Sequence, residues 1–175
     1  MQWSEDGAGR AGALLWLGCF QFFVAEQVVR AHVRGAYSMA RNHISDLGAR
    51  QCFDLGAGCA PLHWVMNASF VLQGLLIVFG SVLVGKLLPS AALVRASRLC
   101  FVLAGAGVLV VGLDPEDGVA RVHFAGAAVH FLAGAVAMLL MGMALRAQAR
   151  RSTVAGTLSV AAGAVTLVAT VLLGA

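Results

Sequence analysis

Charged residues are scarce in this chain, and their scarcity sets the first limit on its fold. Asp, Glu, Lys and Arg together make up 11% of the 175 residues, whereas 60% are hydrophobic. A soluble domain of ordinary composition carries roughly 25% charged residues. The polar side chains are therefore too few to cover a water-soluble globule, and a soluble fold is excluded.

Lysine is almost absent, and no dense basic run replaces it. Of the 12 basic residues only Lys86 is a lysine, and most of the arginines lie between apolar runs. We interpret them as topology signals and expect no nucleic-acid partner. The chain also lacks a C-x-x-C pair, so it carries no cysteine pattern of a structural zinc site. The N-terminal segment lacks the basic start and small-x-small cleavage site of a signal peptide, so we expect it to belong to the mature protein.

Hydrophobic runs dominate what remains. A helix needs about 20 apolar residues to span the hydrocarbon core. Five such runs predict an all-α fold, a polytopic transmembrane bundle of about five helices in one domain over 1–175. Their approximate ranges are 11–30, 62–86, 96–113, 122–146 and 153–174. Of the connecting segments, only 31–61 is long enough to hold structure of its own.

The basic residues predict an orientation in the cell membrane. Segments 86–98 and 146–151 contain arginine or lysine and no acid, which favours a cytoplasmic location for both. The N-terminus would then be cytoplasmic, and the loop 31–61 would lie outside. That loop has arginines of its own, so the excess of basic residues inside is small.

Polar residues gather at one membrane face in this arrangement. Successive helices run in opposite directions, so the ends of the first and third runs share a face with the starts of the second and fourth. The residues concerned are Glu26, Arg30, His63, Asn67, Asp114, His123 and His130. Ionisable groups at membrane depth are costly and need partners, which predicts a polar crevice there.

Spacing adds detail to this crevice. Glu26 and Arg30 are four residues apart on one helix face and are expected to pair. His130 lies two turns beyond His123, which is ~10 Å deeper at 1.5 Å per residue. These two histidines are expected to line a crevice rather than to share one ion, because paired ligands on a helix usually lie four residues apart.

Several of these residues also have a purely structural interpretation. His63 next to Trp64 could anchor the membrane interface. Asp114-Pro115-Glu116-Asp117 resembles a helix start, with Asp at the N-cap and Pro at the first helical position. The glycines favour close helix packing and could support a homo-oligomer. Cys52 and Cys59 can form a disulfide if their loop is outside, whereas Cys19 and Cys100 lie in helices.

The first loop carries a recognisable motif. Residues 37–48 include Tyr37-Ser38 and Ile44-Ser45-Asp46-Leu47-Gly48, and residues 112–117 with His123 form a second, weaker stretch. Together they resemble the bacterial membrane family called domain of unknown function 998. A related I-S-D-x-G pattern occurs in the eukaryotic membrane superfamily of the DRAM autophagy modulators and the Frag-type GPI-remodelling proteins. The family is expected to have about six helices, one more than the runs counted here, and the resemblance implies no activity.

The motif leaves two interpretations open. Ser45 and Asp46 could cap a helix, with Gly48 at a turn. Alternatively, the loop could fold over the crevice and bring Asn42, His43, Ser45 and Asp46 to His63, Asp114, His123 and His130. We expect Asp46 to pair with one of the helix histidines.

The polar residues of the crevice and of the loop suggest three possible functions. Ser45, Asp46, Asp114, His123 and His130 could carry out metal-assisted or acid–base hydrolysis of a membrane lipid or other amphiphile. The candidate ligands of a divalent metal are Asp46, Asp114, His123 and His130. The alternative is a non-catalytic lipid-binding, regulatory or assembly protein. A solute or proton pathway is less favoured, because no polar track crosses the membrane.

Overall fold

The computed structural model describes residues 2–53, 56, 58–84, 92–147 and 153–173. Within these residues the fold is an all-α bundle, and five helical segments are long and apolar enough to cross a membrane. They span Gly7–Ala31, His63–Val84, Ala92–Leu113, Ala120–Ala147 and Thr153–Leu172. The chain is therefore a multi-pass membrane protein, as its hydrophobic runs predicted.

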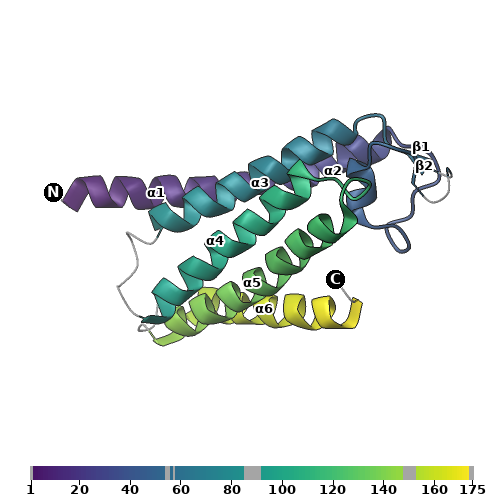
Figure 1. Cartoon of the computed structure of the whole chain (residues 1–175). Coiled ribbons are helices and arrows are strands. Elements are labelled where there is room, and N and C mark those ends of the chain that lie inside the picture. Colours follow the sequence, from purple (N-terminus) through teal and green to yellow (C-terminus); the bar gives the residue numbers. More distant parts are fainter. Residues whose placement is uncertain (1, 54–55, 57, 85–91, 148–152, 174–175) are drawn as a thin grey trace.

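The helices follow one another across the bundle in chain order (Figure 1). Their bounds are α1 Gln2–Gly18, α2 Gln21–Ala31, α3 His63–Val84, α4 Ala92–Leu113, α5 Ala120–Ala147 and α6 Thr153–Leu173. Helix α1 packs on α3, α3 on α4, α4 on α5 and α5 on α6. Many large apolar side chains stay exposed on the outer surfaces of these helices, as expected for a bundle whose solvent is lipid.

The first span is not the single helix that the sequence predicted over 11–30. It breaks at Cys19 and Phe20, whose amides bond to carbonyls three residues earlier at 3.1 Å. Gln21 then begins α2 and reaches across to α3. Its amide nitrogen donates to the Ser69 carbonyl at 3.1 Å and to Gln73 Oε1 at 3.3 Å, while Ser69 Oγ donates to Gln21 Oε1 at 2.9 Å. These bonds hold the N-terminal end of α2 against α3.

Glycine faces glycine where neighbouring helices cross. At the α4–α5 crossing, a Cβ on Gly107 would lie 2.5 Å from the Gly126 carbonyl oxygen and 2.7 Å from the His130 nitrogen. The other three crossings are made by Gly12 with Gly80, Gly74 with Gly105 and Gly142 with Gly156. In lipid, such close backbone approach replaces the hydrophobic drive that packs helices in water.

The connection between α2 and α3 is a compact structure. Strands β1 (Arg34–Gly35) and β2 (Gly58–Cys59) pair antiparallel, and the 3₁₀ helix η1 covers Ile44–Gly48. Leu47 is fully buried and joins the core between α2, α3 and α4. The predicted loop 31–61 is therefore folded against one end of the bundle, which we call the loop face.

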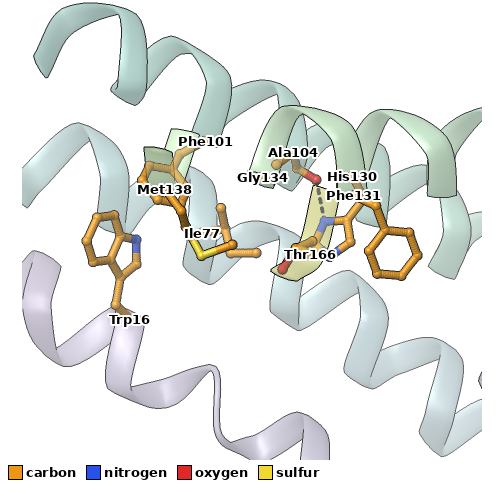
Figure 2. Close-up of a pocket in the computed structure, with 9 residues that line it drawn as sticks. All are labelled: Trp16, Ile77, Phe101, Ala104, His130, Phe131, Gly134, Met138 and Thr166. Atoms are coloured by element: carbon orange, nitrogen blue, oxygen red, sulfur yellow. Dashed lines mark hydrogen bonds between the residues drawn. The ribbon is translucent and has the colours of Figure 1, made fainter. Parts of the chain in front are cut away.

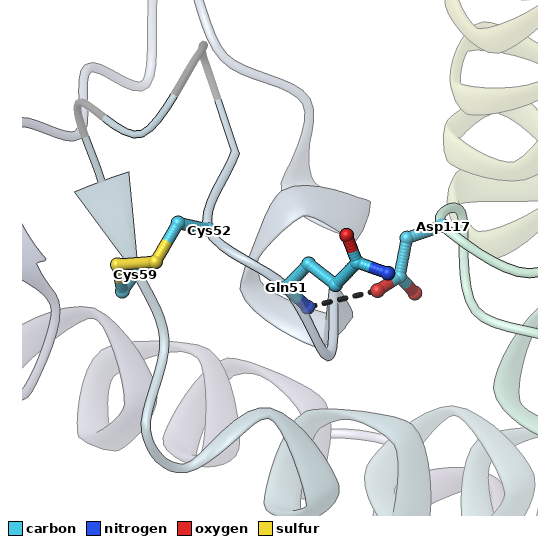
Figure 3. The surroundings of a disulfide bond; sticks show 4 residues. All are labelled: Gln51, Cys52, Cys59 and Asp117. Atoms are coloured by element: carbon cyan, nitrogen blue, oxygen red, sulfur yellow. Dashed lines mark hydrogen bonds between the residues drawn. A yellow bond between two sulfur atoms is a disulfide. The ribbon is translucent and has the colours of Figure 1, made fainter.

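Cys52 and Cys59 form a disulfide, as the sequence allowed, with their Cα atoms 4.2 Å apart (Figure 3). The bond ties the segment before β2 to β2 itself. Gly56, between the two cysteines, has φ +91°, a conformation that L side chains rarely adopt. A substitution at Gly56 would therefore strain the backbone between the two cysteines.

The residues that predicted the orientation are only partly described. Lys86, Arg150 and Arg151 lie outside the described residues. Arg98, at the start of α4, donates from Nε to the Ser81 carbonyl and from a terminal nitrogen to the Val82 carbonyl, both at 3.1 Å. A cation here satisfies carbonyls near the end of α3 and opposes the negative end of its dipole.

Candidate functional site

The polar residues named from the sequence lie at the loop face, except for His130, which lies ten residues along α5 from its first residue. The end of α2, the start of α3, the end of α4 and the start of α5 all lie at this end of the bundle, beside β1, β2 and η1 (Figure 1). The alternation of helix directions predicted this arrangement. The structure adds how the loop is attached.

Glu116, in the turn between α4 and α5, holds η1. Ser45 Oγ donates a hydrogen bond to Glu116 Oε2, and His43 Nδ1 lies 3.2 Å from Glu116 Oε1. The Glu116 side chain is only 21% exposed, whereas that of His43 is 66% exposed. One carboxylate thus binds two residues from a segment some 70 positions earlier in the chain.

Residues 114–119 are a turn and not the helix start suggested by the sequence. The Gly118 amide donates to the Pro115 carbonyl at 2.7 Å, the Val119 amide donates to Asp114 Oδ1 at 3.1 Å, and α5 begins only at Ala120. Asp114 therefore closes the turn. Glu116 lies in this turn, before α5 begins, and its carboxylate contacts the loop instead of capping a helix.

Asp117 makes a second attachment (Figure 3). Its Oδ2 accepts a hydrogen bond from the backbone N–H of Gln51 at 2.8 Å, and its Oδ1 lies 3.7 Å from Arg50 Nε. The Asp117 side chain is 18% exposed. The turn thus holds the loop at both ends of the segment 43–51.

Asp46 does not make the predicted contact with a helix histidine in the described part of the chain. Its Oδ2 accepts hydrogen bonds from the Asn42 side-chain amide at 3.2 Å and from the His43 backbone amide at 3.1 Å. It therefore caps η1, which was the structural alternative. Burial raises the pKa of this carboxyl, the charge of Glu116 raises it further, and the bonds from Asn42 and His43 oppose both effects.

A cavity of about 510 Å³ lies beneath η1, and we call it the loop-side pocket. Four residues named from the sequence line it, namely His43, Ser45, His123 and His130. The other lining residues are mostly apolar: Phe22, Ile44, Phe70, Gln73, Val108, Val111, Phe124, Ala127 and Phe131. Residues of the loop and both histidines of α5 therefore line the same cavity.

The two histidines of α5 present the same ring nitrogen to the backbone. His123 Nδ1 lies 2.8 Å from the Asp114 carbonyl oxygen, and His130 Nδ1 lies 2.9 Å from the Ala104 carbonyl oxygen. A carbonyl only accepts, so each neutral ring carries its proton on Nδ1 and has its lone pair on Nε2. Neither Nε2 has a partner among the described residues, so both can accept a hydrogen bond from a ligand.

A second cavity of about 320 Å³, the deep pocket, lies further from the loop face (Figure 2). Trp16, Ile77, Phe101 and Met138 contribute to its apolar wall. His130 and Phe131 line both cavities, so the two meet at these residues. We call these two adjoining pockets together the groove; its polar lining side chains lie at the mouth and where the pockets adjoin.

Comparison with known proteins places the chain in a family. The family model described as "Protein of unknown function (DUF998)" matches residues 11–175. The chain belongs to this family. No curated protein and no solved structure matches it.

The remaining residues named from the sequence do not line the loop-side pocket. The expected Glu26–Arg30 pair is not formed in the described structure. Arg30 instead donates to Gln27 Oε1 and contacts Met39 Sδ, while Glu26 is 5% exposed. The predicted ion pair is wrong because Arg30 turns toward the loop.

Asn67 and His63, both near the start of α3, lie outside the loop-side pocket. Asn67 Nδ2 donates to the Gly48 carbonyl at 2.9 Å and so joins η1 to α3. His63 Nδ1 is buried without a hydrogen-bond partner among the described residues, next to the 62%-exposed Trp64. Neither side chain lines the loop-side pocket.

The proposed metal ligands do not form a metal site. Within the described ranges, no three His, Cys, Asp or Glu side chains gather closely enough to hold an ion. Asp46 and Asp114 use their carboxylates within their own turns, as described above. Of the four candidate ligands, the two aspartates thus stabilise turns and the two histidines line the loop-side pocket.

The sequence did not predict the roles of two residues, Glu116, which binds η1, and Gln73, which lines the loop-side pocket. Glu116 was assigned to a helix start, and Gln73 was one polar residue within a long apolar run. The signal that could have found Gln73 is its depth in the membrane, where an amide needs a partner. Glu116 gave no local signal, because its partners are distant in sequence.

Proposed function

We propose that this protein binds a single-chain membrane amphiphile in the groove formed by the two pockets. The observation that supports this best is the lining of the loop-side pocket. His43, Ser45 and His123 lie at its mouth, and Phe22, Phe70, Val108, Val111 and Phe131 line its walls. A cavity with a few convergent polar groups and apolar walls is the usual form of a small-ligand site. Here the polar groups lie at the membrane face, where headgroups lie.

The headgroup is expected to be neutral and to carry hydroxyl groups. No Lys or Arg belongs to the lining of the loop-side pocket in the described structure, and Glu116 adds a negative charge next to its mouth. A phosphate would meet unfavourable electrostatics there, since phosphate sites are usually built from cations. A hydroxyl can donate to His123 Nε2 and accept from a neighbouring donor.

Binding is tested by incubating the purified protein, in nanodiscs, with 1-octadecanoylglycerol and detecting the complex by native mass spectrometry. We expect one bound molecule, displaced in a variant that fills the pocket, Ala127→Phe. Val154→Phe is the control, because Val154 is 73% exposed on α6 and lines neither pocket. Equal binding by all three proteins would contradict the proposal.

Hydrolysis of the bound amphiphile is the second candidate, supported by His123. Its Nδ1 is held by the Asp114 carbonyl, which leaves Nε2 as a base in the same pocket as the Ser45 hydroxyl. A base held in one tautomer and a nearby hydroxyl are two of the parts of an acyl-transfer site. Release of octadecanoate from the same glycerol ester, lost in His123→Gln while binding persists, would support this candidate. A protein that binds the ester without cleaving it is a binding protein.

The orientation proposed with this function places the loop face outside the cell. The Cys52–Cys59 disulfide supports it, because structural disulfides persist in oxidising compartments. The acid-free basic segments 86–98 and 146–151 support it from the other side. A membrane-impermeant thiol reagent applied to intact cells should label Arg50→Cys and not Arg150→Cys, and the reverse pattern would overturn the orientation.

A further inference from the structure

Two polar side chains lie at the same distance along their helices from the loop face. Gln73 is ten residues from the first residue of α3, His63, and His130 is ten residues from the first residue of α5, Ala120. Both helices begin at the loop face, so each residue lies ~15 Å along its helix from that face. The hydrocarbon core is ~30 Å thick, which places both near its middle.

Both side chains also line the loop-side pocket. Gln73 Oε1 accepts from Gln21, so the amide group that remains available is a donor. His130 Nδ1 is held by the Ala104 carbonyl, so the atom that remains available, Nε2, is an acceptor. The described residues thus offer one unused donor and one unused acceptor on the walls of one cavity.

Such groups are costly where no water or lipid headgroup can satisfy them. A polar group removed from water without a hydrogen bond destabilises the structure, because its desolvation is not compensated. Polar residues at membrane depth are rare and usually face a functional cavity. Val108 and Met138, on the walls above and below this level, offer no partner, and Thr166 is the one side-chain hydroxyl among the described residues that line the deep pocket.

We propose that Gln73 and His130 form a mid-membrane binding point for a hydroxyl group on the hydrocarbon chain of the ligand. A hydroxyl both donates and accepts, so it matches His130 Nε2 and the Gln73 amide together. The proposal rests on the proposed binding of an amphiphile and adds the class of its chain. The ligand is an amphiphile whose chain carries a hydroxyl near its middle.

The dimensions of the groove agree with this class. His130 lies seven residues, or ~10 Å, deeper than His123, which lines the same pocket closer to the mouth. At roughly 3.5 Å per three bonds of an extended chain, that distance corresponds to about eight or nine bonds. The chain beyond the hydroxyl would continue into the deep pocket, where Trp16 and Phe101 lie (Figure 2).

The test compares two probes that differ by one hydroxyl, 1-octadecanoylglycerol and 1-(10-hydroxyoctadecanoyl)glycerol. Dissociation constants are measured by native mass spectrometry of the full chain in nanodiscs. We expect the hydroxylated probe to bind about tenfold more tightly to the unmodified protein, because its hydroxyl satisfies two groups that line the cavity and have no other partner there. His130→Leu and Gln73→Leu should remove this preference and retain affinity for the plain probe.

Two further variants keep the result interpretable. His130→Gln retains an acceptor and should retain part of the preference, even if the leucine variant fails to fold. Thr166→Val is the control for a second hydroxyl in the groove, because Thr166 lines the deep pocket and not the loop-side pocket, and it should leave the preference unchanged. Equal binding of both probes to the unmodified protein, or a preference that survives in both leucine variants, would overturn this inference alone. Failure of both probes to bind would overturn the proposed function with it.

Discussion

The attachment of the loop by Glu116 can be measured directly. Glu116→Ala removes the acceptor of both Ser45 and His43. A hydrogen bond from a partly buried hydroxyl to a carboxylate contributes about 1.5–3 kcal/mol. The contact with His43, whose side chain is 66% exposed, contributes about 0–1 kcal/mol, as solvent-exposed pairs do. Together the two contacts contribute about 1.5–4 kcal/mol, so opening of the segment 38–50 should become roughly 10- to 700-fold more frequent, since 1.4 kcal/mol is a factor of ten.

The assay is hydrogen exchange of peptides from this segment, read by mass spectrometry with the protein in nanodiscs. A double-mutant cycle separates the two contacts, because Ser45→Ala should couple strongly to Glu116→Ala and His43→Ala only weakly. Arg41→Ala serves as the control, since Arg41 is exposed in the same loop. Unchanged exchange in Glu116→Ala, or stronger coupling through His43 than through Ser45, would refute the reasoning.

Three other changes test separate features. Because burial and Glu116 raise the pKa of Asp46, this carboxyl stabilises the folded loop fully below its ordinary pKa and loses that contribution as pH rises through the raised value. Exchange of the loop should accordingly slow as pH falls through this range, after correction for intrinsic rates, and Asp46→Asn should remove that part of the pH dependence. Gly126→Ala should destabilise the bundle by about 1–3 kcal/mol, because its Cβ would lie 2.8 Å from a carbonyl oxygen of α4. Gly134→Ala in the same helix meets only one side-chain atom, at 3.8 Å, and should leave the melting temperature in detergent unchanged or higher. Replacing Cys52 and Cys59 with serine should cost the loop about 2.5 kcal/mol by the chain-entropy relation, seen as faster proteolysis of the loop with helix content preserved; equal proteolysis of both forms would contradict this.

The sequence predicted the features that depend on hydropathy and on helix direction. The five spans, the gathering of polar residues at the loop face and the Cys52–Cys59 bond follow from run length, alternation and spacing. These features can be predicted because a chain in a bilayer must form all its backbone hydrogen bonds internally, and a row of apolar segments can do so as membrane-spanning helices.

The contacts that build the site could not be predicted in the same way. Asp46 had two compatible partners, and the nearby amides of Asn42 and His43 prevailed over the distant histidines because a local cap costs little chain entropy. Glu116 follows an Asp-Pro pair that is typical of helix starts, and only the tertiary position of Ser45 shows its other role. The break at Cys19 depends on bonds between Gln21 and α3, which no local pattern encodes.

The order in which the helices pack has a consequence for how the protein is made. Each long helix packs mainly on the next one along the chain, so most contacts between helices join neighbouring segments. Contacts of low sequence separation form quickly, because closing short connections costs little entropy. Helices α1 to α4 can therefore pack as they leave the insertion machinery. The bonds of Glu116 and Asp117 to the loop, by contrast, can form only when residues 114–119 have emerged, so the polar end of the groove closes after α1 to α4 have formed.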